Sequence, residues 1–492
     1  MKDLIISAPN QGIGPSPITG YGNVVNLDIY TIPGVARLNN LLAKKSSTTV
    51  VGTIQWMVKN PATPAEVYAL DDGGNVYKSS DSGDTWALMT GFTAGGHGNG
   101  LAIWKNYLIV ARDAFLDVCG DGTATGITNA NWTNSWKAID SDVLWHPMIV
   151  SYNDGILYGG AGKYMFSLEE LTTFVPATGA TFDFVTRATL LPSNYRIKCL
   201  AELGGNIMIG TWMGTSITDF KVANVYPWDT GATVSAPLEM NENGVNSMLT
   251  INNSLYMQVG IEGKVYRSNG VQAVQIAQIP SSITDIEGGL YLEPFPGAIM
   301  NYKGRPFFGV SSGGSGATAA GMGIWSIQQN AKGNTLNYEH QISTLSDGSS
   351  STVKIGALLP FSRDTMLVGW KDASTYGVDK TTNTSRYTSY SGYFESPFYN
   401  VGTPLVKRMF NKGEFQLTKA LTTGQGVKIK YRTDLSSSFT TIGTYDFATL
   451  AGVLSHNFVA DIPACEFVQI RCELTTGSSS NTSPQIKQIT LR

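Results

Sequence analysis

The sequence predicts an all-β protein: a β-propeller of about seven blades followed by a small C-terminal antiparallel β-sandwich. Three observations lead to this fold class. Charged residues make up 14% and aromatic residues 10% of the 492-residue chain, which also has 54 glycines, and this composition is typical of β-rich structure with many turns. A strand–turn–strand unit recurs roughly every 40–60 residues, as blades do. After Glu395-Ser396-Pro397 the pattern changes to strongly alternating strands.

These changes predict three segments: an extended N-terminal arm over 1–22, the β-propeller over 23–395 and the sandwich over 396–492. The arm is rich in Pro and Gly and has little periodicity. It could lie on a neighbouring subunit or be a simple disordered terminus. We expect Val24–Tyr30 to be the early strand that closes the propeller, with Tyr387–Phe394 as a candidate for the closing blade.

The most clearly patterned element is the stretch from Ser79 to Trp86. Two strands precede it, and Asp81 and Gly83 suit a tight turn, because the Asp side chain accepts hydrogen bonds from turn N–H groups and Gly adopts positive φ without strain. Trp86 opens the next strand and has the bulk to fill the space between two packed sheets. The stretch therefore predicts a hairpin of one antiparallel sheet.

This hairpin resembles the Asp-box of sialidases and other β-propellers. The resemblance implies a structural role, away from any active site. The residues that carry it are Ser79, Asp81, Gly83, Thr85 and Trp86.

Six further units repeat the apolar strand and the Gly, Asn or Asp turn, and lie within Ile103–Val110, Ser151–Gly159, Leu203–Gly210, Ile251–Met257, Tyr302–Val310 and Ser362–Gly369. A blade cannot bury both faces of its sheet alone, and stacking blades around an axis does so. The sandwich strands are predicted at Gly413–Leu417, Val427–Arg432, His456–Ala460, Phe467–Leu474 and Ile486–Leu491.

Charge and cysteine content exclude some classes of function. The net charge of −3 provides no basic footprint for direct nucleic-acid binding. None of the four cysteines forms a CxxC pair, and unpaired buried thiols are favoured over a Cys465–Cys472 bridge. No run approaches the ~20 apolar residues that span a bilayer, so membrane insertion is not expected.

No catalytic, cofactor-binding or metal-binding residue is predicted, and the chain is expected not to be an enzyme. The four histidines lack metal-site spacing, and His97 fits a blade turn better than a general base. Asp117–Gly122 resembles half of a calcium loop but lacks the distal Glu, so an ordinary Asp-Gly turn is favoured. A glycosidase needs two carboxylates across one cleft, and the sequence cannot pair its candidates Asp113, Asp117, Glu242 and Asp379. The arginines that could hold an acidic sugar are scattered: Arg112, Arg187, Arg196, Arg267 and Arg305.

The whole layout is similar to that of propeller-containing structural proteins of tailed bacteriophages. The residues that carry the resemblance include the arm, Asn26–Tyr30, Pro33–Val35, Glu242–Val245 and Tyr393–Pro397. The resemblance implies a subunit of the tail nozzle, in a homo-oligomeric ring that contacts other tail proteins. DNA would pass through the lumen without specific binding. The protein would be made in the host cytoplasm and reside in the virion. Two alternatives stay open: a tail adhesin that binds a glycan or protein on the host surface, and a glycan hydrolase.

Overall fold

The computed structural model describes most of the chain. The described residues are 3–8, 23–45, 50–92, 95–140, 144–170, 182–192, 194–214, 219–279, 291–313, 322–330, 333–341, 353–477 and 480–492. In these ranges the regular secondary structure is nearly all strand, and the only helix is α1 (Phe447–Leu450). The prediction of an all-β protein is confirmed.

The chain divides into two compact units. The first comprises 43–323 and 345–380, and the second comprises 1–42, 324–344 and 381–492. Neither unit is continuous in sequence, whereas the predicted segments 1–22, 23–395 and 396–492 are. The domain boundaries therefore stay a prediction.

The first unit contains five sheets that each consist of four consecutive antiparallel strands. Short turns with Gly or Asn, such as Lys105-Asn106, Gly204-Gly205 and Asn252-Asn253, join several of these strands, as the repeats predict. The sheets are β6 (Ile54–Lys59), β7 (Val67–Asp71), β8 (Val76–Ser79) and β9 (Ala87–Leu88); β10 (Gly98–Trp104), β11 (Tyr107–Arg112), β12 (Phe115–Cys119) and β13 (Trp132–Ala138); β14 (Met148–Val150), β15 (Leu157–Ala161), β16 (Tyr164–Glu170) and β17 (Phe182–Leu190); β18 (Tyr195–Leu203), β19 (Asn206–Met213), β20 (Ala223–Trp228) and β21 (Leu238–Met240); and β22 (Val245–Ile251), β23 (Ser254–Val259), β24 (Lys264–Ser268) and β25 (Ala273–Gln278).

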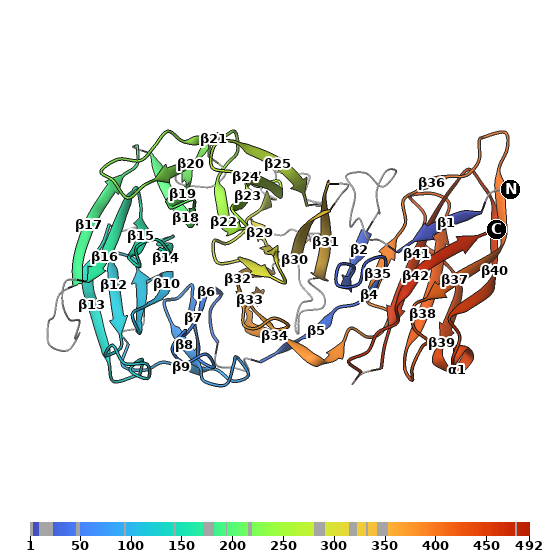
Figure 1. Cartoon of the computed structure of the whole chain (residues 1–492), viewed down its shortest axis with the longest axis horizontal. Helices are drawn as coiled ribbons and strands as arrows, with labels where there is room; N and C mark the ends of the chain where they lie inside the picture. The colour runs from blue at the N-terminus through green and yellow to red at the C-terminus, as the bar shows by residue number, and fades with distance from the viewer. Residues whose placement is uncertain are drawn as a thin grey trace. The chain divides into compact units, whose positions relative to one another are not determined.

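The remaining strands of this unit complete a ring. They include β26 (Tyr291–Leu292), which pairs with β29 (Ser312–Gly313), β27 (Ile299–Tyr302), which pairs with β28 (Arg305–Val310), and a closing sheet that begins with β32 (Lys354–Pro360). The first strands of successive sheets are neighbours in the order β6, β10, β14, β18, β22, β27 and β32, and β32 returns to β6. Figure 1 shows the sheets arranged around one centre. The β-propeller prediction is confirmed. About seven blades stays a prediction, because the outer strands of a sixth blade would be β30 (Gly323–Asn330) and β31 (Gly333–Gln341), which are counted in the second unit.

The closing sheet corrects one expectation. Its order is β32 (Lys354–Pro360), β33 (Met366–Asp372), β34 (Thr375–Arg386) and β5 (Asn40–Lys44). The early strand is therefore β5 and not Val24–Tyr30. Within that stretch, β2 (Asn23–Val25) instead pairs with β35 (Gly392–Glu395), outside the closing sheet. Several short apolar strands near the N-terminus have similar patterns, and only the path of the folded chain selects among them.

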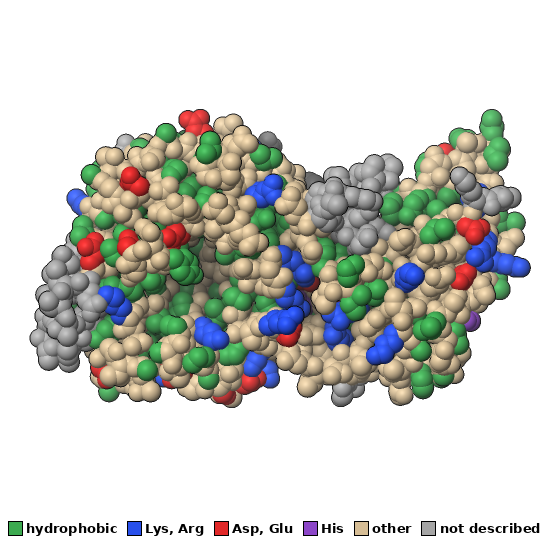
Figure 2. Space-filling model, in the orientation of Figure 1, with side chains coloured by type: hydrophobic (Ala, Val, Ile, Leu, Met, Phe, Trp, Pro, Cys, Tyr) green, Lys and Arg blue, Asp and Glu red, His purple; other side chains and the backbone are tan. Residues whose placement is uncertain are grey.

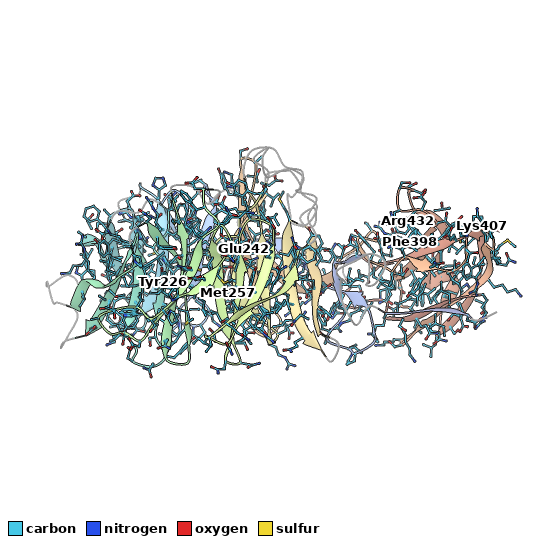
Figure 3. The ribbon with its side chains drawn as sticks, turned by 90° about the horizontal axis from the view of Figure 1, so that it is seen from above. Tyr226, Glu242, Met257, Phe398, Lys407 and Arg432 are labelled. Atoms are coloured by element: carbon cyan, nitrogen blue, oxygen red, sulfur yellow. The ribbon has the colours of Figure 1, made fainter. Side chains whose placement is uncertain are left out.

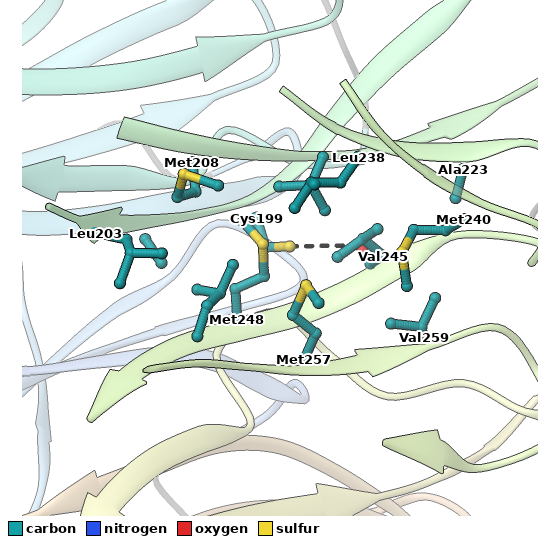
Figure 4. Close-up of a cluster of buried hydrophobic side chains, with 13 residues drawn as sticks. Cys199, Leu203, Met208, Ala223, Leu238, Met240, Val245, Met248, Met257 and Val259 are labelled. Carbon is teal, nitrogen blue, oxygen red and sulfur yellow. Dashed lines mark hydrogen bonds between the residues drawn. The ribbon is translucent and has the colours of Figure 1, made fainter. Parts of the chain in front are cut away.

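Adjacent sheets pack through buried apolar clusters. Figure 4 shows one cluster, in which four methionines pack with Cys199 and Val245 between the sheet of β18–β21 and that of β22–β25. Near the axis the first strands approach one another so closely that some positions admit only glycine. A Cβ at Gly100 would overlap the carbonyl oxygen of His146, and one at Gly356 that of Ile54.

The second unit contains strands of two larger sheets and one separate strand pair. One has the order β1 (Leu4–Ser7), β42 (Ile486–Leu491), β37 (Arg408–Leu417) and β40 (Ser455–Cys465). The other includes β31, β2, β35, β41 (Phe467–Thr475), β38 (Gly426–Arg432) and β39 (Thr440–Asp446), in that order. Strand β36 (Tyr399–Asn400) also pairs with β41. Strands β3 (Leu27–Asp28) and β4 (Arg37–Leu38) form the separate pair. Phe415 and Tyr445, from different sheets, have ring centroids 5.2 Å apart. The sandwich stays a prediction.

Part of the predicted N-terminal arm belongs to this unit. Residues 4–7 form β1 and pair with the last strand, with Leu4 opposite Leu491. The side chain of Asp3 also accepts a hydrogen bond from Arg492 at 3.1 Å. Residues 9–22, where the arm was expected to reach a neighbour, lie outside the described residues.

The four cysteines are free thiols, and all are buried. The favoured interpretation, in which Cys465 and Cys472 are not bridged, is confirmed. Burial raises the pKa of the Cys472 thiol well above its usual value, so it stays protonated and packs as a small apolar group.

Candidate functional site

The hairpin predicted at Ser79–Trp86 forms a closed hydrogen-bond network around Asp81. One carboxylate oxygen, Oδ1, accepts hydrogen bonds from the Thr85 N–H at 2.8 Å, the Asp84 N–H at 3.0 Å and the Ser79 hydroxyl at 2.8 Å. The other, Oδ2, accepts from the Thr85 hydroxyl at 2.6 Å. Slight burial acts to raise the pKa of Asp81, but the hydrogen bonds from Thr85, Ser79 and Asp84 outweigh it and lower this pKa to about 2.

The same hairpin connects two sheets. Trp86 is buried in a cluster with residues of β6–β8 and of β32–β34, including Ile54 and Leu367, so its predicted place between packed sheets is confirmed. Asp84 forms ion pairs with Lys45, 2.9 Å away, and Lys380, 2.7 Å away, on the closing sheet. The hairpin is therefore a structural joint of the ring, with every polar group of Asp81 used internally.

The first unit has one face on which its loops could form a binding site. In a four-stranded antiparallel meander, the start of the first strand and the turn between the second and third strands lie at the same edge of the sheet. Repeating this sheet around an axis brings these loops to a common face of the ring. We call it the loop face.

A groove of about 650 Å³ opens on the loop face between the third and fourth sheets. Its residues come from the loop after β13, the β15–β16 turn, the start of β18 and the loop after β19. The lining residues are Asp140, Gly162, Lys163, Tyr164, Asn194, Tyr195, Arg196, Met213, Gly214 and Phe220. This volume lies within the range of ligand sites, which is roughly 300–1,000 Å³.

Charged and aromatic side chains lie in the groove and directly beside it. The Arg187 guanidinium lies 4.2 Å from the ring centroid of Tyr164 and pairs with Asp140 at 3.4 Å. Tyr195 packs edge to face on Tyr226, with centroids 5.8 Å apart. Tyr226, labelled in Figure 3, accepts a hydrogen bond from Asn224 at 3.0 Å, and burial raises its pKa, so the phenol stays protonated beneath the groove.

A second polar cluster lies where the first strands meet the axis. Lys198 on β18 is buried and donates a hydrogen bond to the Asn246 Oδ1 on β22 at 2.8 Å. Its ammonium nitrogen lies 5.5 Å from the ring centroid of Trp145, which packs edge to face on Phe295. Burial lowers the pKa of Lys198, and the charge of Glu293 offsets this only in part. Figure 2 shows the hollow at the centre of the ring.

The candidate catalytic carboxylates are not brought into one cleft. They lie on three different sheets, and each has its own partner: Asp113 with His97 Nδ1 at 2.9 Å, Asp117 with Arg112 Nε at 2.6 Å, Glu242 with Lys264 Nζ at 2.7 Å, and Asp379 with Trp370 Nε1 at 2.7 Å. These contacts tie turns and strands together.

Two other candidates from the sequence are structural as well. Asp121, in the half calcium loop, accepts hydrogen bonds from the N–H and hydroxyl of Thr123 at 2.9 and 2.6 Å, as an Asp turn does. His97 lies on the surface beside Asp113. Within the described ranges, no three His, Cys, Asp or Glu side chains could hold a metal ion together. No helix in these ranges is long and apolar enough to cross a membrane.

The sequence did not reveal the groove. Arg187 and Arg196 were named among scattered arginines, and the structure brings both to the surroundings of Tyr164. Their segments lie on neighbouring sheets, so no local motif could link them.

No family model and no curated protein matches this sequence. Among solved structures, a YCF48 bound to D1 peptide is 11% identical and has a TM-score of 0.45 over 75% of this chain and 99% of its own. The β-propeller domain of Myceliophteria thermophila Cps50 (Swd1) is 9% identical, with a TM-score of 0.41 over 69% of this chain and 100% of its own. A Phanerochaete chrysosporium exo-β-1,3-galactanase covers both chains fully at 9% identity, with a TM-score of 0.28. At these scores the similarities carry no argument, and the propeller fold is seen in the sheets themselves.

Proposed function

We propose that this protein is a structural subunit of a bacteriophage tail, in a homo-oligomeric ring that extends the tail tube as a nozzle. The sequence resemblance suggests the role. The observation that supports it most is the second unit, which is built from both ends of the chain and adds to the propeller a body with exposed apolar side chains.

One stretch that carries the resemblance, Asn26–Tyr30, is integral to that body. Asp28 accepts hydrogen bonds from the N–H groups of Tyr30 and Thr31 and from Arg37, whose Nη2 lies 2.7 Å away. Burial acts to raise the pKa of Asp28, but the Arg37 charge and these hydrogen bonds hold it far below its usual range. Ala36 pairs with Ile486, so this corner is bound to the last strand. A rigid body of this kind suits a virion component.

An exposed turn between β36 and β37 offers a contact for a second copy. Thr403 and Val406 exchange backbone hydrogen bonds at 2.8 and 3.1 Å and so present Pro404 and Leu405 at the tip. Leu405 is 95% and Val406 71% exposed. Lys407, labelled in Figure 3, follows directly. Neighbouring exposed apolar side chains of this kind often mark protein contacts.

The experiment is to measure the assembly of the full chain by mass photometry and negative-stain microscopy. We expect closed rings, and Leu405→Asp should reduce them while leaving the melting temperature unchanged. Val271→Asp, at another highly exposed apolar position, on the β24–β25 turn, is the matched control. Rings that persist in Leu405→Asp would show that the turn at Thr403–Val406 is not part of the interface. A virion reconstruction with isolated copies at fibre tips would favour the adhesin over the nozzle.

The expectation that the chain is not an enzyme is part of this proposal. Each candidate carboxylate has a structural partner, which supports a scaffold over a glycan hydrolase. Release of sugar from a panel of polysaccharides by the full chain would contradict it.

A further inference from the structure

We propose that the groove between the third and fourth sheets is a binding site for an oligosaccharide. The inference goes beyond the tail-structural role and does not depend on it, since a ring subunit and a monomer could both carry such a site. It rests on the aromatic side chains, the charges and the backbone of the groove.

The aromatic side chains of the groove supply flat apolar surfaces. Phe220 is 50% exposed at the groove, although an aromatic side chain normally buries most of its ring. Tyr164 and Tyr195 are half-buried beside it. Each combines an apolar ring with a hydroxyl group, which suits a ligand with both C–H faces and hydroxyls. A sugar ring has this combination.

The charges favour a hydroxyl-rich ligand over a polyanion. Three cations, Lys163, Arg187 and Arg196, lie in or beside the groove, together with two carboxylates, Asp140 and Asp219. Planar guanidinium and carboxylate groups present paired donors or acceptors, which match neighbouring hydroxyls of a saccharide. The near balance of charge is unlike the strongly basic grooves that bind nucleic acid. We therefore infer a neutral or weakly acidic oligosaccharide.

One buried polar atom of the groove lining has no hydrogen-bond partner in the structure. It is Oδ2 of Asp140, whose other carboxylate oxygen pairs with Arg187 at 3.4 Å. Buried polar atoms are normally paired, so this oxygen can accept a hydrogen bond from a hydroxyl of a ligand.

One residue of the groove lining, Asn194, has a positive φ of 82°. Asn adopts positive φ more readily than most residues, yet such a position costs energy in any residue but Gly. The Asn194 side chain is exposed here and adds an amide with both a donor and an acceptor.

The test uses the purified full chain, labelled with a fluorophore, on an array of neutral, carboxylated and phosphorylated oligosaccharides. The soluble form of the strongest hit is then titrated by calorimetry. Phe220→Ala and Lys163→Ala should each weaken its binding by about tenfold or more, which corresponds to about 1.4 kcal/mol. The matched control is Tyr152→Ala. Tyr152 is 95% exposed, and it lies in the β14–β15 turn, at the opposite edge of the third sheet.

Binding to neutral or carboxylated members that depends on Phe220 and Lys163 but not on Tyr152 supports the proposal. A silent array overturns it, as does binding that both groove variants retain or that Tyr152→Ala weakens equally. A preference confined to phosphorylated probes would contradict the inferred ligand class. Ring assembly of Phe220→Ala is measured in parallel and should be unchanged. Failure of the saccharide site and failure of the nozzle are thus distinguishable.

Discussion

The hairpin of Ser79–Trp86 and the groove at Tyr164 and Phe220 are built in opposite ways. The hydrogen bonds of Asp81 connect residues at most four positions apart, and turn chemistry alone specifies them. The groove is lined by four separate segments from two sheets and two connecting loops. Its side chains are held mainly by contacts to residues distant in sequence. We conclude that the local hydrogen bonds of the hairpin stabilise the fold, whereas the groove, which is assembled from distant segments, leaves side chains available for a ligand.

Among substitutions in the hairpin, Trp86→Ala should cause the largest loss of stability. Removing the indole leaves a cavity among residues of two sheets, and the cost should be ~3–5 kcal/mol of unfolding free energy. Chemical denaturation measures it. An unchanged midpoint would show that the cluster around Trp86 does not stabilise the ring.

Gly83→Ala should cost less, about 1–3 kcal/mol, because it strains the backbone and crowds the neighbouring sheet. Gly83 has a φ of 85°, and a Cβ there would lie 2.7 Å from Leu367 Cδ2. Thermal denaturation of this variant beside Gly34→Ala separates the two causes. Gly34 has a similar φ of 73° but nothing within 4 Å of its added Cβ. Equal losses in both variants would contradict a role for Leu367.

Lys198→Met tests whether the buried polar cluster of Lys198 and Asn246 stabilises the fold, as the hairpin does. Burial lowers the pKa of Lys198 in the folded protein, so the unfolded chain holds this proton more tightly. The contribution of Lys198 to stability is therefore complete above its ordinary value of 10.5 and is lost as the pH falls through the folded-state pKa. We expect the stability of Lys198→Met relative to the wild type to rise as the pH falls across this range. A difference that is constant with pH would contradict the shift.

Asp81→Asn should have a small effect that depends on pH. The folded-state pKa of Asp81 is lowered to about 2 from 3.8, so its contribution is complete above 3.8 and is lost as the pH falls through about 2. Because this carboxyl is largely exposed, solvent screening limits the expected loss at neutral pH to roughly 0.2–1 kcal/mol. Urea titrations at pH 7 and pH 2 measure it. A loss of stability at pH 2 as large as that at pH 7 would show that the effect does not come from the charge of Asp81.

Phe220→Ala should have the smallest effect on stability, within about 0.5 kcal/mol of the wild type, because half of the ring is already exposed. Its melting temperature should match that of Tyr152→Ala. A clear loss of stability would make Phe220 a packing residue and would weaken the contrast between groove and hairpin.

The all-β class, the strand repeats, the Asp81 turn and the burial of Trp86 could be predicted from the sequence, because alternation and turn chemistry act over a few residues. The strand of the second unit predicted at Ile486–Leu491 has the bounds seen in the structure. Tertiary structure alone decided that β5 completes the closing sheet, that β1 pairs with β42, and that Arg187 and Arg196 lie around Tyr164. The physical reason is that such pairings depend on where the chain returns in space. Many short strands have patterns that would permit the same contacts, so only packing of the whole ring and of the second unit selects among them.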